Sequence, residues 1–188
     1  MSMTADDWKR EQLERHDEAR LAGRADRAAR TSVHGVIPGQ FFAAASSECR
    51  DVFIDGHYYA CISLSQAVAE GLAHFLGDFH KVGARKDPAK RVQRLHAKGV
   101  IRLTVLNAFL RIWGNDRNTF HHLNPDIPTD HPTLEGRAEE CVKALLEIES
   151  EIFAFDTADG GRIAPRHPEY WPKDDPQHMR VFLRLSGH

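Results

Sequence analysis

Cysteine is scarce in this sequence of 188 residues, and no stretch stays apolar for long. Cys49, Cys61 and Cys141 stand far apart and show no C-x-x-C spacing. This pattern is typical of reduced, buried thiols rather than of a disulfide framework. No apolar run reaches membrane-spanning length, and the charged opening residues lack the apolar segment of a signal peptide. We therefore expect a soluble cytoplasmic protein with no membrane partner.

An excess of either charge is also absent. Lys and Arg number 25 against 27 Asp and Glu, which gives a formal net charge of −2. This balance neither proposes nor excludes a nucleic-acid partner, because a local basic patch would not change the total. Repeats and low-complexity tracts are missing too, and 41% of the residues are hydrophobic. One domain with appendages is the expected organisation.

Helical periodicity dominates the middle of the chain. The sequence predicts a mainly α fold, with a bundle of four to five helices over residues 38–156. Residues 1–37 form a charged N-terminal helix or arm, with Thr4 at the expected helix start. In the C-terminal extension, residues 157–188, the segment "GGRIAPRHPEYWP" and the alternating "MRVFLRLS" predict a small β-hairpin.

The segment "HYYACISLSQAVAEGLAHFLGDF", residues 57–79, is the best candidate for a central core helix. Its apolar side chains recur at helical spacing over about six turns. Glu70 lies on this helix among small residues. We take it as a candidate to support a substrate site, and ordinary solvent exposure is the alternative.

A basic stretch follows, "HKVGARKDPAKRVQRLHAKGVIR", in which eight Lys and Arg residues face one acid, Asp87. Pro88 fits the first position of a helix and Gly99 fits its end, so the sequence predicts a short basic helix. Arg91, Arg94 and Lys98 are candidate phosphate-binding residues on it. A solvated charged face is the alternative interpretation.

The run "GNDRNTFHHLNP", residues 114–125, follows the apolar helix "VIRLTVLNAFLRIWG" and concentrates polar side chains. A metal site would need three or four ligands of fixed geometry. Candidate ligands exist in and after the run, but no H-E-x-x-H or comparable spacing is present. We therefore expect no metal and no cofactor.

Metal-free phosphoester chemistry fits the run better. Arg117 can bind a phosphate at two points, and His122 can exchange a proton near neutral pH. Asn118 can orient the phosphate, and a second copy of the run from another subunit could add the missing acid. In a regular helix Arg117 and His122 would point about 140° apart, whereas Arg117 and His121 would point about 40° apart. Either the run straddles a helix start, or His121 is the working residue.

These residues resemble the R-N-x-x-x-H form of the R-x4-6-H motif of the HEPN superfamily (higher eukaryotes and prokaryotes nucleotide-binding). In "RNTFHH", Arg117, Asn118 and His122 stand on the matching positions. The segment "DVFIDGHYYACISLSQAVAEGLAHFL" also resembles the first two core helices of that family, including the glycine-aromatic turn and the A-x-A-E stretch. The resemblance covers roughly residues 38 to 155.

The resemblance implies a helical bundle that forms a homodimer, with the motifs of the two chains facing each other across a cleft. Many members of the family are metal-independent endoribonucleases that leave a 2′,3′-cyclic phosphate. They serve in toxin–antitoxin, phage-defence or RNA-processing systems, so a cognate antitoxin or regulatory protein is a further expected partner. The alternatives are a HEPN-like RNA-binding, nucleotide-binding or protein-interaction module without catalysis, and a helix C-terminus capped by arginine and histidine.

Overall fold

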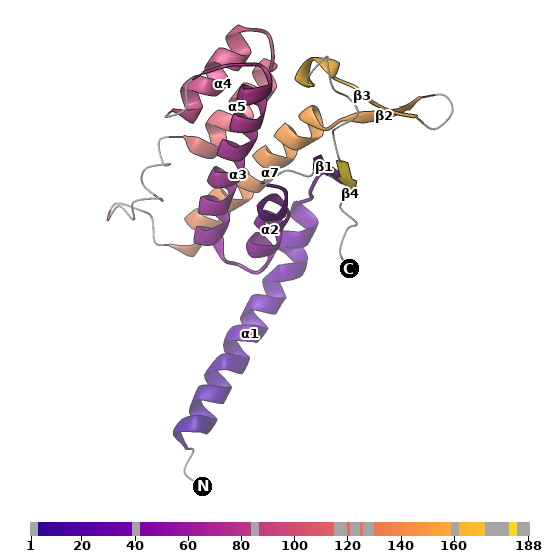
Figure 1. The fold of residues 1–188 in the computed structure, drawn as a ribbon. Helices are drawn as coiled ribbons and strands as arrows, with labels where there is room; N and C mark the ends of the chain where they lie inside the picture. Colours follow the sequence, from indigo (N-terminus) through magenta and orange to yellow (C-terminus); the bar gives the residue numbers. More distant parts are fainter. Residues whose placement is uncertain are drawn as a thin grey trace.

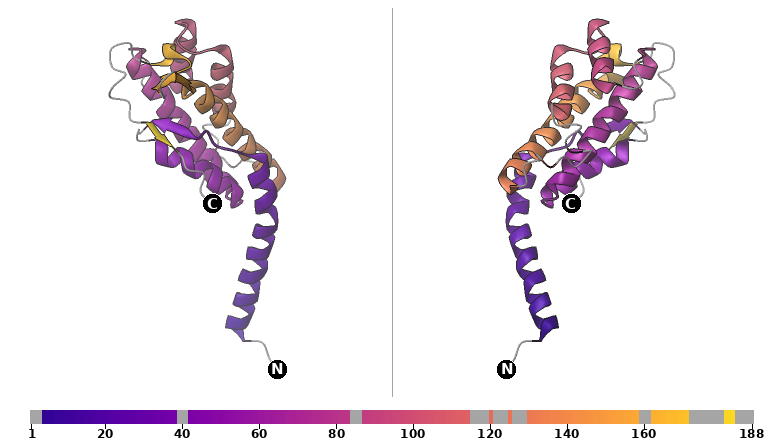
Figure 2. Two further views of the ribbon diagram at one scale, coloured as in Figure 1. Left: turned by 90° about the vertical axis from the view of Figure 1, so that its right-hand side faces the viewer. Right: turned by 90° about the vertical axis from the view of Figure 1, so that its left-hand side faces the viewer.

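The computed structural model describes residues 4–38, 42–83, 87–114, 120, 125, 130–158, 162–171 and 181–183. Its described part is mainly helical, as predicted. The helices are α1 (Ala5–Arg30), α2 (Ala43–Ile54), α3 (Tyr58–Phe79), α4 (Pro88–Ala97), α5 (Leu103–Trp113) and α7 (His131–Ile152). Helices α2 to α7 pack into one bundle, and α1 projects from it as a long rod (Figures 1 and 2).

Helix α3 lies at the centre of the bundle, where it packs against α2, α4, α5 and α7. The apolar side chains predicted for its core stripe are buried, except Phe79, which is partly exposed. The three cysteines are buried among them, as expected. In the described part, no helix combines the length and the apolar character needed to cross a bilayer.

Helix α1 begins where the sequence predicted. Thr4 and Asp7 form a capping box, in which each side chain bonds the main chain of the other residue. The last three turns of α1 dock on the bundle. Arg20 and Arg24 pair with Asp55, and the Nε of buried Arg27 donates to the Ile54 carbonyl at 2.8 Å. Trp8 on the projecting part is 52% exposed. The helix is therefore an arm held at its C-terminal end.

Two helix ends near the polar run have local causes. Helix α5 ends at Gly114, whose φ of 41° favours glycine. A Cβ added at this position would lie 2.8 Å from Arg137 Nη2. Helix α7 begins at His131. Asp130 caps it by accepting the Thr133 N–H at 2.9 Å.

The predicted C-terminal hairpin pairs differently. Strands β2 (Phe155–Ala158) and β3 (Arg162–Pro165) form an antiparallel hairpin directly after α7. Strand β4 (Val181–Leu183) pairs instead with β1 (Val36–Pro38), near the end of α1. The predicted small hairpin is therefore present, but β2 and β3 form it, and the last strand pairs outside the C-terminal extension. Alternation identifies a strand but says nothing about its partner.

Candidate functional site

Helix α3 carries a row of polar side chains along one side. Tyr59, Ser63, Gln66, Glu70 and His74 lie within about 80° of arc at 100° per residue, and we call this row the α3 polar face. Gln66 is 1% exposed, and neither atom of its amide makes a hydrogen bond within the described part of the structure. Buried polar groups normally have a partner, so this face is an unusual place in the core.

Two anchors bracket residues 115–119 of the polar run, and both contact the α3 polar face. Trp113, the last residue of α5, donates its indole N–H to the main-chain carbonyl of Gln66 at 3.4 Å. Phe120 is 4% exposed, and its ring meets the Tyr59 ring edge-on with centroids 5.2 Å apart. Gln66 and Tyr59 are separated by about 10 Å along α3. Residues 114–119 therefore lie in the chain between two anchors that both contact α3.

The predicted catalytic residues Arg117, Asn118, His121 and His122 lie outside the described residues. Their nearest described neighbour in the chain is Phe120, three residues after Arg117 and two before His122. The buried Phe120 ring fixes this point of the run against Tyr59. The catalytic role of His122, or of His121 in its place, stays a prediction.

An open cavity of about 310 Å³ lies beside Tyr59, between the first turns of α3 and α7. We call it the aromatic cavity. It is lined by Gly56, His57, Tyr58, Tyr59, Ala60, His131 and Leu134. His57 and His131 are exposed, whereas Tyr58 is buried. Sequence reasoning missed this group, because His57 and His131 are far apart in the chain and meet only through the packing of α3 against α7.

The Tyr58 wall of the cavity belongs to a hydrogen-bonded network. Tyr58 donates its hydroxyl to Glu135 at 2.6 Å, and Arg30 of α1 donates to the same carboxylate. Burial, reinforced by the bond to Glu135, raises the pKa of Tyr58. Burial also raises the pKa of Glu135, but the hydrogen bonds from Tyr58 and Arg30 outweigh it and lower the pKa overall. The network therefore holds a neutral tyrosine against a charged glutamate.

At the other end of the α3 polar face, His74 links Glu70 to Arg91. His74 was not predicted from the sequence. Arg91 Nη1 lies 2.5 Å from His74 Nδ1, and His74 Nε2 lies 3.7 Å from Glu70 Oε1. Because guanidinium is only a donor, Nδ1 of His74 must be the acceptor, so its proton sits on Nε2 toward Glu70. The i, i+4 spacing of Glu70 and His74 was the available signal.

Arg91 was expected on an exposed, phosphate-binding face of the basic helix, and the structure corrects this expectation. It is 1% exposed, and a Cβ at Gly77 would lie 2.8 Å from its Cδ. Arg94 on α4 and Lys98 directly after it are exposed. Gly77 lies about 27 Å from Tyr59 along α3, so α4 and the Phe120 anchor contact opposite ends of that helix. The structure does not bring these basic residues to the aromatic cavity.

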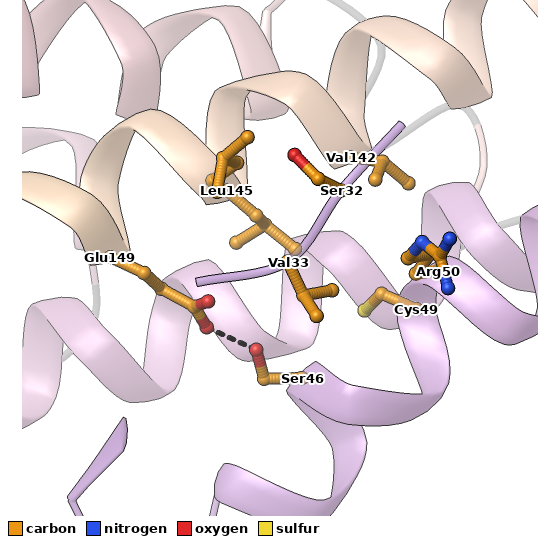
Figure 3. Close-up of a pocket in the computed structure, with 9 residues that line it drawn as sticks. Ser32, Val33, Ser46, Cys49, Arg50, Val142, Leu145 and Glu149 are labelled. Atoms are coloured by element: carbon orange, nitrogen blue, oxygen red, sulfur yellow. Dashed lines mark hydrogen bonds between the residues drawn. The ribbon is translucent and has the colours of Figure 1, made fainter. Parts of the chain in front are cut away.

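A second cavity lies between α2 and α7, under the segment that follows α1 (Figure 3). Its volume of about 10 Å³ suits no more than one water molecule. Ser46 donates a hydrogen bond to the buried Glu149 carboxylate at its edge. The size of this cavity identifies a packing feature rather than a substrate site.

Within the described residues, no three His, Cys, Asp or Glu side chains converge in a way that could hold a metal ion. No protein-family model, curated protein or solved structure matches the chain.

Proposed function

We propose that this protein is a HEPN-like, metal-independent endoribonuclease that cleaves RNA to 2′,3′-cyclic phosphate ends. The observation that carries the proposal is the pair of anchors, Trp113 and Phe120, on the α3 polar face. In the chain they flank the segment that contains Arg117 and Asn118. Catalytic groups need a rigid support, because a misplacement of about 1 Å can cost about 10²-fold in rate.

The proposed reaction is an internal transesterification. The 2′-oxygen loses its proton to a base and attacks phosphorus, and the bond from phosphorus to the 5′-oxygen breaks. The 5′-oxygen takes a proton from an acid, which leaves a cyclic phosphate and a 5′-hydroxyl. His122, or His121 in its place, transfers protons, Arg117 stabilises the charge on the phosphate oxygens, and Asn118 orients the phosphate.

One chain supplies too few groups for this reaction, so the proposal includes a homodimer. A symmetric contact would double each residue and allow a histidine of the second chain to act as the acid. A cognate antitoxin or regulatory protein would act on such a dimer from outside.

A non-catalytic binding or interaction module is the second candidate. The observation that favours it is α1, which projects from the bundle with Trp8, Leu13 and Leu21 each more than half exposed. Large apolar side chains on a projecting helix suit a protein contact. This candidate predicts a partner and no RNA cleavage.

Incubation with single-stranded and structured RNA in EDTA separates the two candidates. The endoribonuclease should cleave without metal and leave 2′,3′-cyclic ends. Arg117→Lys should not rescue activity, because lysine keeps the charge and loses the planar two-point contact. Arg15→Lys, on the exposed part of α1, is the matched control and should cleave normally. Equal cleavage by both variants would rule out the proposed role of Arg117.

A further inference from the structure

The aromatic cavity is large enough for a planar ring. Its volume of about 310 Å³ falls at the lower end of the range for small-ligand sites. Ring side chains of His57, Tyr58, Tyr59 and His131 form much of its lining. Such rings can stack on a nucleobase of any sequence, because every base has a π face.

The walls of the cavity are already ordered. The Tyr58 ring meets the His131 ring edge-on at 5.8 Å, and its hydroxyl is bonded to Glu135. The Tyr59 ring is held in the same way by Phe120. Both tyrosines therefore keep their orientation without a ligand, and binding would not have to order them.

The charge of the lining favours a base over a phosphate. Among the described residues that line the cavity, none is lysine or arginine. The nearby Arg30 is paired with Glu135 and Glu139. A neutral ring with hydrogen-bonding edges suits histidine and tyrosine better than an anion does.

The position of the cavity relates it to the proposed reaction. Tyr59 is both a wall of the cavity and the contact of Phe120, which stands between Arg117 and His122 in the sequence. From this geometry we infer that the aromatic cavity binds the base of a single-stranded RNA nucleotide next to the cleaved phosphate. This inference rests on the proposed endoribonuclease function and names the subsite that holds its substrate.

Binding is measured with a short single-stranded RNA that carries 2′-O-methyl groups, which cannot be cleaved because the attacking hydroxyl is blocked. Tyr59→Leu and His57→Ala should weaken binding, each by roughly five- to 150-fold, the range of base stacking on one aromatic side chain. Tyr59→Phe keeps the ring and should bind within about threefold of wild type. His16→Ala, on the exposed part of α1, is the control and should bind normally.

Thermal unfolding of each variant confirms that it is folded, and His57 is exposed, so its loss leaves the core intact. Unchanged binding by Tyr59→Leu and His57→Ala would overturn the inference, as would competition by inorganic phosphate alone. Cleavage of unmodified RNA without binding of the blocked RNA would overturn the inference and keep the endoribonuclease. Binding that depends on the cavity, without cleavage of unmodified RNA, would keep the subsite and overturn the proposed reaction.

Discussion

The ring of Phe120 lies edge-on against the ring of Tyr59, with centroids 5.2 Å apart and planes at 63°. This contact joins the polar run after α5 to the first turn of α3. It also borders the aromatic cavity, since Tyr59 forms one wall. A single aromatic pair thus connects the proposed catalytic segment with the proposed base site.

Shortening Phe120 should separate folding from activity. Phe120→Ala should lower the free energy of unfolding by about 3–5 kcal/mol, because a buried ring is replaced by a cavity. Phe120→Leu should cost less than about 1.5 kcal/mol. Its RNA cleavage should still fall by about 10²-fold, because the edge-on ring contact of residue 120 with Tyr59 is lost. Urea unfolding and a cleavage assay measure the two effects.

Leu103→Ala is the control for Phe120, since Leu103 is equally apolar but 57% exposed. It should change stability by no more than about 0.5 kcal/mol. Equal losses of unfolding free energy in Leu103→Ala and Phe120→Ala would contradict the role of Phe120 as an anchor.

Two helical glycines should respond in opposite ways to alanine. A Cβ at Gly77 would lie 2.8 Å from the side chain of buried Arg91, whereas a Cβ at Gly136 would meet nothing within 4 Å. Gly77→Ala should therefore destabilise the fold by about 1–3 kcal/mol. Gly136→Ala should stabilise it by about 0.4–1 kcal/mol, because alanine loses less backbone entropy. Thermal unfolding of both variants measures the difference, and a stabilised Gly77→Ala would refute the packing of Arg91.

Glu135 should stabilise the protein in a pH-dependent way. Its pKa in the folded protein is below the ordinary value of 4.5. A carboxyl group with a lowered pKa contributes fully above its unfolded pKa and loses its contribution as the pH falls through the folded value. Glu135→Gln should thus cost about 1–3 kcal/mol at neutral pH, and this cost should shrink below about pH 4.5.

Urea unfolding at several pH values gives this comparison. Glu147→Gln is the control, because the Glu147 carboxylate is 52% exposed and pairs with Arg111 on the surface. Its effect should stay below about 1 kcal/mol. A Glu135→Gln cost that grows toward acid pH would contradict the network.

Light scattering tests the homodimer. The protein at micromolar concentration should show the mass of two chains, because the reaction needs groups from both. A strict monomer that still cleaves RNA would remove the composite site.

The helices could be predicted from the sequence because their signals are local. The Thr4 and Asp7 capping box and the stop at Gly114 each depend on a few neighbouring residues. Strand pairing is not local, and nothing in residues 181–183 indicates that they pair with residues 36–38. For the same reason the meeting of His57 and His131 beside the cavity could not be foreseen.

Arg91 is a different case, because its burial could have been read from the sequence. Pro88, Arg91, Val92 and Leu95 follow the i, i+3, i+4, i+7 pattern of one helix face, and all four are buried. Because the basic residues were grouped by charge alone, the position of Arg91 on the apolar side of the helix was missed. The exposed basic residues are instead Lys90 and Arg94 of α4 and Lys98 directly after the helix.

The most direct test of the account is the cleavage rate of single-stranded RNA in EDTA by wild type, Arg117→Ala, His122→Ala and the double variant. If both side chains serve one transition state, each single variant should lose most of the activity, and the double variant should lose little more than either one. Full cleavage by the double variant would contradict the proposed catalytic role of this pair.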